Sequence, residues 1–198
     1  MHSYHEQLQT HALIDLTNRA KSGMLTYLCV WLILVYTYQL HIIHPTFFYL
    51  NSALLVAFFL SRIIHYITLT KIQTTNTELL NKWIVTTLLA TAAHWGGMSA
   101  WIIFDDRLIE LRNVILIITP ALALGGACTL SISSEIRTFY PMLMCMPFIT
   151  MLVNNGSAEN LMLAILGSIC LAYIFLSSKA SHNDYWSAIT NHMVAEER

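Results

Sequence analysis

Charged residues are scarce in this chain of 198 residues. Only 11% of them are Asp, Glu, Lys or Arg, whereas 56% are hydrophobic and the mean hydropathy is +0.58. A soluble domain carries about 25% charged residues and needs them to cover its surface. The formal net charge of −1 also lacks the basic excess that nucleic-acid binding requires. The composition therefore favours an integral membrane protein and indicates no nucleic-acid partner.

Motifs of catalysis and of metal binding are lacking too. The sequence has no glycine-rich phosphate loop, no nucleophile elbow and no His-Glu-x-x-His pair. Zinc sites and disulfide frameworks use paired cysteine spacings, but here the cysteines lie at unrelated spacings inside apolar runs: Cys29, Cys128, Cys145 and Cys170. We therefore expect no enzyme and no metal site in this chain. The first 22 residues do not have the pattern of a cleavable signal peptide.

Long apolar runs are what the sequence does contain. There are six, and most approach the ~20 residues that a helix needs to cross a membrane. They cover residues 23–43, 47–69, 83–104, 114–133, 139–153 and 160–178. The fifth is short and contains Pro141 and Pro147, so a bundle of five spans, with this run kinked or partly buried, is an alternative. The predicted fold is an all-α integral membrane bundle of six transmembrane helices.

Basic residues are unevenly distributed among the segments that connect these runs. With a cytoplasmic N-terminus, the inner segments contain most of them: Arg19, Lys21, Lys71, Lys82, Arg137, Lys179 and Arg198. The outer segments have only Arg107 and Arg112, next to three acidic residues. Because cytoplasmic loops are enriched in Lys and Arg, both ends are predicted to be cytoplasmic. The chain then divides into a cytoplasmic segment 1–22, a transmembrane domain 23–178 and a cytoplasmic segment 179–198.

Small residues recur every four positions in two of the runs. Such stripes allow close backbone approach, which favours helix packing in lipid. One stripe lies in the third run and one in the fourth: Ala92, Gly96 and Ala100, then Ala121, Gly125 and Thr129. Both stripes are predicted to face neighbouring helices. The alternative is that small residues are simply common in membrane helices.

Histidines and charged residues at membrane depth are costly and are therefore candidates for function. His94, followed by Trp95, lies near the middle of the third run, and the pair is a candidate site for sensing a signal. A neutral imidazole bonded across helices is the simpler account of His94. Arg62 and His65 lie one turn apart near the inner end of the second run, where they form a candidate inner relay. Alternatively, Arg62 extends to the lipid headgroups.

A second group of candidates lies at the predicted outer face. His41 and His44 flank the first outer turn, and Asp105 and Asp106 open the second outer loop. We expect them to form an outer rim of the sensing site. Two imidazoles three residues apart are weak evidence for a bound metal, because interfacial histidines are usually only solvated.

No cofactor is indicated, and a bis-histidine haem is disfavoured. His65 lies about four residues and His94 about eleven residues from the inner boundary, so at ~1.5 Å per residue their depths differ by roughly 10 Å. Haem ligands must lie at nearly equal depth on facing helices. Transport is also disfavoured, because the chain lacks the internal repeats with broken helices that are common in transporters.

The segment after Lys179 is polar but still favours a helix. His182, Trp186, Ile189 and Met193 follow a spacing of three and four residues along one helix side, which is the pattern of a coiled-coil seam. We expect the sixth helix to continue as a signalling helix that pairs with a second copy of the chain. The alternative is an amphipathic tail on the membrane surface.

The C-terminal half resembles a known kind of sensor. The features that carry the likeness are Gly125 and Gly126 followed by Ser131, then Phe139-Tyr140-Pro141, Pro147, the Asn155-Gly156 turn and Asn183 to Trp186 near the exit. This pattern resembles the N-terminal membrane sensor regions, of the MASE-like type, of bacterial GGDEF diguanylate cyclases and hybrid sensor histidine kinases.

This resemblance implies a homodimer in the bacterial cytoplasmic membrane. It also implies that the bundle detects a signal in or at the membrane and regulates a C-terminal cytoplasmic output domain that this chain does not contain. The output would be a diguanylate cyclase or a histidine kinase. Two alternatives from other classes remain, a small channel or transporter and a structural subunit of a membrane complex.

Overall fold

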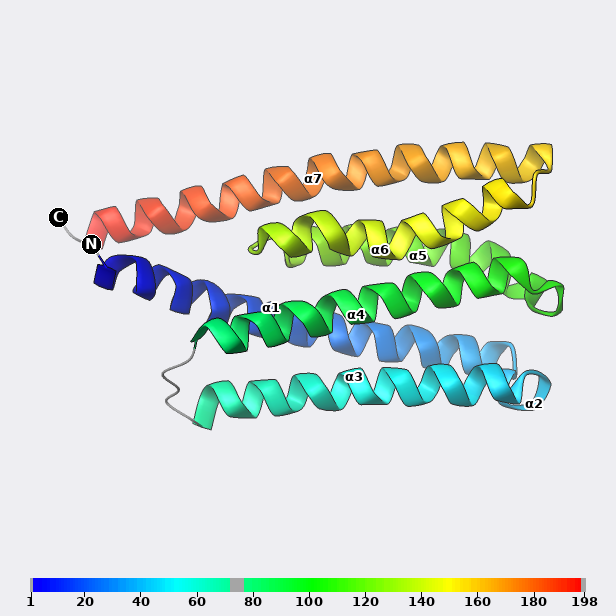
Figure 1. Ribbon diagram of the computed structural model, residues 1–198, viewed down its shortest axis with the longest axis horizontal. Helices are drawn as coiled ribbons and strands as arrows, with labels where there is room; N and C mark the ends of the chain where they lie inside the picture. Colours follow the sequence, from blue (N-terminus) through cyan, green and yellow to red (C-terminus); the bar gives the residue numbers. More distant parts are fainter. Residues whose placement is uncertain (1, 72–76, 197–198) are drawn as a thin grey trace. The chain divides into compact units, whose positions relative to one another are not determined.

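The computed structural model describes the backbone of residues 2–71 and 77–196 and the side chains of residues 8, 10–69 and 78–191. Every regular element in these residues is helical, as predicted (Figure 1). The elements are α1 (His2–Thr37), α2 (Leu40–Ile43), α3 (Pro45–Lys71), α4 (Thr77–Phe104), the 3-10 helix η1 (Asp106–Leu108), α5 (Ile109–Thr129), α6 (Ser134–Asn154) and α7 (Ala158–Glu196). The chain forms two compact units, Met1–His94 and Trp95–Arg198, and the division falls within α4.

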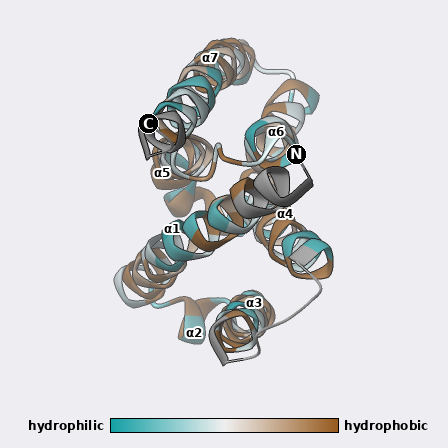
Figure 2. Ribbon diagram, turned by 90° about the vertical axis from the view of Figure 1, so that its left-hand side faces the viewer, coloured by the Kyte–Doolittle hydropathy of each residue, from teal (hydrophilic) through white to brown (hydrophobic). Residues whose placement is uncertain are grey.

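Five helices are long and apolar enough to cross a membrane. They lie within Thr10–Thr37, Pro45–Leu69, Asp106–Thr129, Ser134–Asn154 and Ala158–Asn191. Large hydrophobic side chains are exposed along them, and hydrophobic segments run through the helices of both units (Figure 2). The predicted fifth run is therefore a helix of sufficient length, α6, despite its two prolines. Helix α4 has 28 residues but is not among the five, because threonines, glycines and His94 dilute its apolar residues.

The first predicted run, residues 23–43, is not one helix. Gln39 has a φ of 49°, in the left-handed region, and separates α1 from α2. A right-handed helix cannot continue through a residue in that conformation. At its other end α1 begins at His2, so the described part of the predicted segment 1–22 is the start of the same helix.

Helix α3 of the first unit buries a stripe that mixes apolar and polar residues. Its members follow the helical spacing of three and four: Phe47, Asn51, Leu55, Arg62 and His65. Helix α1 has a buried stripe of the same period that includes Tyr27, Trp31 and Leu34. The candidate residues Arg62 and His65 thus belong to the packed side of α3 and are held by the same contacts as its core.

The second unit packs closely where a proline frees a carbonyl group. Pro147 has no N–H, so the carbonyl of Leu143, four residues earlier in α6, loses its helical donor. Gly96 of α4 lies against that oxygen, and a Cβ at this position would collide with it. Ala92, Gly96 and Ala100 are all buried, so this stripe faces its neighbours as predicted. Backbone contact of this kind is what small residues permit in lipid.

The second predicted stripe is wrong. Ala121, Gly125 and Thr129 are exposed, and a Cβ on Gly125 would meet nothing within 4 Å. The buried face of α5 is instead the one that carries Ile115, Thr119, Ala123 and Ala127. Both faces of α5 contain small residues at a spacing of four, and this spacing alone does not select between them.

The last helix continues far past the turn that joins α5 to α6 (Figure 1). The predicted turn before it is confirmed: α6 ends at Asn154, and Gly156 has a φ of +64°, the left-handed conformation that ends many helices. Helix α7 then runs without interruption for 39 residues. At ~1.5 Å per residue it is about twice as long as a membrane span requires.

We predict that Gly96→Ala destabilises the protein by about 1–3 kcal/mol, because the new Cβ meets backbone that cannot rotate away. The matched control is Gly97→Ala, whose Cβ would meet nothing within 4 Å. That control should be neutral or stabilise by up to about 1 kcal/mol, the difference in helix propensity. Thermal unfolding in detergent measures both, and equal effects would contradict the close approach of α4 to α6.

Candidate functional site

Hydrogen bonds join α3 to α4 along much of their length in the first unit, and we call this set of contacts the polar seam. Its interhelical bonds include His65 Nε2 to the Leu80 carbonyl at 3.0 Å, Trp83 Nε1 to Ser61 Oγ at 3.0 Å, Arg62 Nη2 to Thr91 Oγ1 at 3.0 Å and His94 Nε2 to Asn51 Oδ1 at 3.0 Å. The hydroxyls of Ser61 and Thr87 also lie 3.4 Å apart. The seam follows the antiparallel course of the two helices. It contains three of the candidate residues predicted from the sequence, Arg62, His65 and His94.

His94 of α4 forms a hydrogen bond to a residue of α3, as in the simpler of the two accounts of this histidine given above. Its Nε2 donates to the side-chain oxygen of Asn51, and its ring lies 5.8 Å from that of Phe58. Its Nδ1 is buried and has no hydrogen-bond partner among the described residues. A neutral ring with its proton on Nε2 leaves only a lone pair unpaired, which costs less than an unpaired N–H. The geometry therefore fits a neutral imidazole.

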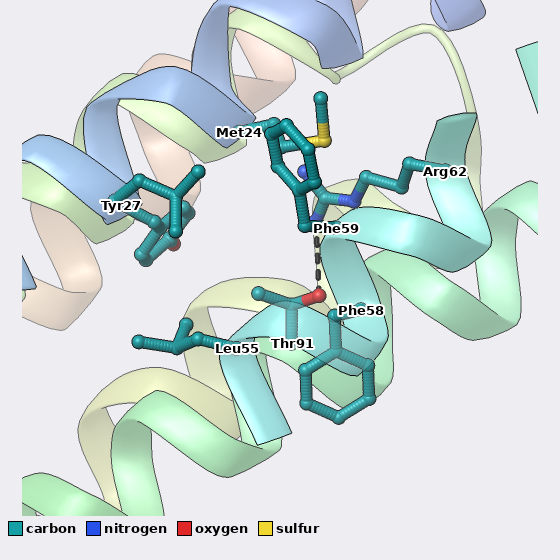
Figure 3. Close-up of a pocket in the computed structure, with 8 residues that line it drawn as sticks. Met24, Tyr27, Leu55, Phe58, Phe59, Arg62 and Thr91 are labelled. Carbon is teal, nitrogen blue, oxygen red and sulfur yellow. Dashed lines mark hydrogen bonds between the residues drawn. The ribbon is translucent and has the colours of Figure 1, made fainter. Parts of the chain in front are cut away.

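Arg62 is buried and bonds across to α4. Only 7% of the residue is exposed, and its guanidinium donates to Thr91 on α4. Side chains on a helix point toward its N-terminus, which directs Arg62 away from the closer end of the span. The side chain also lines a small pocket together with residues of α1, among them Met24 and Tyr27 (Figure 3).

His65 is almost fully buried, at 1% exposure, and stacks edge-on against Trp83. Its Nε2 donates to the carbonyl of Leu80, so Arg62 and His65 bond to different parts of α4. Asn51, the partner of His94, lies 14 residues before His65 on α3. At ~1.5 Å per residue the two imidazoles are separated by roughly 20 Å along the helix, too far to share a haem or a metal.

Trp95 belongs to the second unit, whereas His94 is the last residue of the first. Trp95 is fully buried in the second unit, where Nε1 donates to Thr119 Oγ1 of α5 at 3.2 Å. Ser99 bonds the same hydroxyl at 2.8 Å. Consecutive residues point about 100° apart on a helix, so the two side chains find partners on different helices.

The residues of the predicted outer rim are divided between the two units. His41 and His44 belong to the first unit, where His41 is exposed and packs edge-on against Phe48. Asp105 and Asp106 belong to the second unit, and Asp106 is exposed. Asp105 caps η1 and accepts hydrogen bonds from Arg107, with an ion-pair distance of 2.7 Å. These bonds from Arg107 lower the pKa of the Asp105 carboxyl. The Asp105 carboxyl is therefore engaged by Arg107 within the same turn.

The side chains of α7 bond to the turn between α5 and α6, and we call these contacts the exit latch. His182 Nδ1 donates to the carbonyl of Ser131, and Trp186 Nε1 donates to the carbonyl of Ile132 at 3.2 Å. Helix α5 ends at Thr129, so both acceptors lie just beyond its C-terminus. The first two residues of the predicted seam thus have partners within the same chain. Ile189 is half-buried, and the side chain of Met193 lies outside the described residues.

Sequence reasoning missed the neutral partners of the candidates. Asn51 and Thr91 complete the polar seam, and Thr119 accepts from Trp95. A signal for Asn51 existed, because it shares the spacing of Phe47, Leu55 and Arg62 on α3. Threonine is common in membrane helices, and nothing in the sequence distinguishes Thr91 or Thr119 from exposed threonines such as Thr86.

Among the described residues, no three His, Cys, Asp or Glu side chains are grouped closely enough to hold a metal ion. Comparisons with protein families, with curated proteins and with solved structures found no match for the chain.

We predict that Asn51→Leu destabilises the protein by about 1–3 kcal/mol, because it leaves the Nε2–H of His94 buried without an acceptor. The double variant Asn51→Leu, His94→Leu should be less unstable than the sum of the two single variants, since both polar partners are then removed. Thermal unfolding of all three measures this coupling. Asn113→Leu, on an exposed position of α5, is the control. Strict additivity would contradict a bond between Asn51 and His94.

Proposed function

We propose that the chain is a membrane sensor module that controls an output domain through helix α7. In this proposal the bundle has six spans, because α4 joins the five apolar helices, and both ends are cytoplasmic. The region 83–104 of α4 has no Lys, Arg, Asp or Glu, and several of its small and polar residues are buried, among them Thr91, Gly96 and Ser99. The distribution of basic residues supports this topology.

The observation that carries the proposal is the exit latch. Helix α7 is about twice the length of a span, and its polar extension is held by His182 and Trp186 to the turn between α5 and α6. A displacement of α5 or α6 would therefore move the extension of α7, whose helical backbone transmits it over many residues. A stimulus that favours one arrangement of the bundle would shift the population of α7 positions.

The output and the oligomer belong to the same proposal. The resemblance to the sensor regions of GGDEF diguanylate cyclases and hybrid histidine kinases suggests a cyclase or kinase as output and the bacterial cytoplasmic membrane as location. The same resemblance implies a homodimer. Two copies of α7 would then pair beyond the exit latch, through Ile189 and Met193. The exit latch of each copy would then set the orientation of its α7 helix where the two α7 helices begin to pair.

We predict that Trp186→Phe changes the basal output of the full-length protein several-fold. The substitution keeps a ring but removes the bond to Ile132, which contributes about 0.5–1.5 kcal/mol and thus shifts a two-state equilibrium by about two- to tenfold. Output is measured as cyclic di-GMP or as autophosphorylation. Ser187→Ala, at the exposed neighbouring position, should leave it unchanged.

The first step of this experiment is to sequence the source gene beyond the codon for Arg198. A reading frame that continues through a helical linker into a cyclase or kinase provides the protein for the assay. A frame that stops at Arg198, or equal output from Trp186→Phe and wild type, contradicts the sensor function. The alternatives of a transporter or a partner subunit would then be preferred.

A further inference from the structure

A guanidinium group lies in an apolar pocket of the first unit. Helix α1 contributes Met24 and Tyr27, α3 contributes Leu55, Phe58 and Arg62, and α4 contributes Thr91 (Figure 3). Figure 3 shows the Met24 side chain next to the guanidinium and the ring of Phe58 on the other side of Thr91. The lining thus has one permanent positive charge among aliphatic and aromatic side chains.

The position of this charge is within a membrane span. Arg62 lies seven residues before Leu69, where the apolar part of α3 ends, so its backbone is about 10 Å inside the span. Its side chain is directed still further inward, to Thr91. A charge at this depth is costly to maintain and marks a functional site by default.

Arginine is suited to one class of ligand in particular. Its planar N–H groups match the two oxygens of a carboxylate or of a phosphate, and such charge-assisted bonds are roughly twice as strong as the bond to a neutral hydroxyl. One acceptor of Arg62, Thr91 Oγ1, is a neutral hydroxyl. An anion at the same place would therefore interact more strongly with Arg62 than Thr91 does.

The rest of the lining indicates how such an anion reaches the pocket. A free inorganic anion is poorly soluble at this depth, whereas an anion on an alkyl chain partitions into the bilayer. The side chains of Met24, Leu55 and Phe58 offer the apolar surface that an alkyl chain requires. The pocket as described has room for about one water-sized sphere, so a ligand must displace side chains. Met24 has three rotatable bonds and is the residue most easily moved.

We propose that this pocket binds an anionic amphiphile, with a carboxylate or phosphate head on Arg62 and the start of its alkyl chain between α1 and α3. The inference deepens the proposed sensor function, because it names the chemical class of the signal. Entry of the ligand would separate Met24 of α1 from Arg62 of α3, which gives the first unit two arrangements. Binding itself does not require an output domain and is measured independently of one.

The test is a titration of the whole chain in nanodiscs of zwitterionic lipid, with empty nanodiscs subtracted. The probes are decanoate and decyl phosphate, which distinguish the two heads, together with decanol and inorganic phosphate. We expect at least one of the anionic amphiphiles to bind at least about tenfold more tightly than decanol, since charged hydrogen bonds are lost with the neutral head. Equal binding of decanol, or equal binding of inorganic phosphate, would overturn the proposal.

Variants of the pocket locate the binding. Arg62→Gln should weaken binding of the preferred probe about tenfold or more. Arg112→Gln is the matched control, because it removes the same charge from a half-buried arginine that bonds Asn160 in the second unit. Undiminished binding by Arg62→Gln would place the amphiphile elsewhere and refute the assignment.

Thermal unfolding shows whether Arg62→Gln folds. A second variant tests the proposal if it does not. Leu55→Trp fills the pocket from α3 and keeps the guanidinium, so it should weaken binding of the same probe to a similar extent. A folded Leu55→Trp protein that binds as well as wild type would overturn the proposal. If these variants lose binding, but the output of the full-length wild-type protein does not respond to the probe that it binds, the sensor function is contradicted and the binding site stands.

Discussion

The carbonyl groups of the turn between α5 and α6 need hydrogen-bond donors, and α7 supplies them. Backbone carbonyls in a turn lack the partners that a helix provides, and such groups are costly where water is scarce. Ser131 and Ile132 receive donors from His182 and Trp186, which lie four residues apart on one side of α7. A slide of α7 by one turn, about 5.4 Å, would break both bonds at once. The longest helix of the chain is thereby held in one register against its own unit.

Helix α4 takes part in polar contacts in both units. His94 bonds Asn51 of α3 in the first unit, and Trp95 bonds Thr119 of α5 in the second. Because both residues belong to one continuous helix, a rotation of α4 would disturb both bonds. Gly96, the next residue, fixes the same part of α4 against the backbone of α6. Three consecutive residues thus connect the packing of α4 to α3, α5 and α6, each within its own unit.

Three features of the fold could be predicted from the sequence: the all-helical class, the turn at Asn155 and Gly156, and the long final helix. They depend on the length of apolar runs and on local turn chemistry. The break at Gln39 could not, since nothing in its neighbourhood signals a left-handed residue. The exposed face of α5 was misassigned because small residues occur on both of its sides. His94, Arg62 and His65 were recognisable from their cost in a membrane, but their partners were not. Asn51, Thr91 and Thr119 are neutral residues whose role appears only when two helices are placed together.

The central claim is that α7 moves with the turn between α5 and α6. A distance measurement between spin labels at Ser134 and Asn183, two exposed positions on α6 and α7, tests it most directly. The four native cysteines are first replaced by alanine. The account predicts one narrow distance distribution, which broadens or shifts when His182→Leu and Trp186→Phe are combined. The account would be contradicted by a broad distance distribution in the protein that keeps His182 and Trp186. A narrow distribution that the two substitutions leave unchanged would also contradict it.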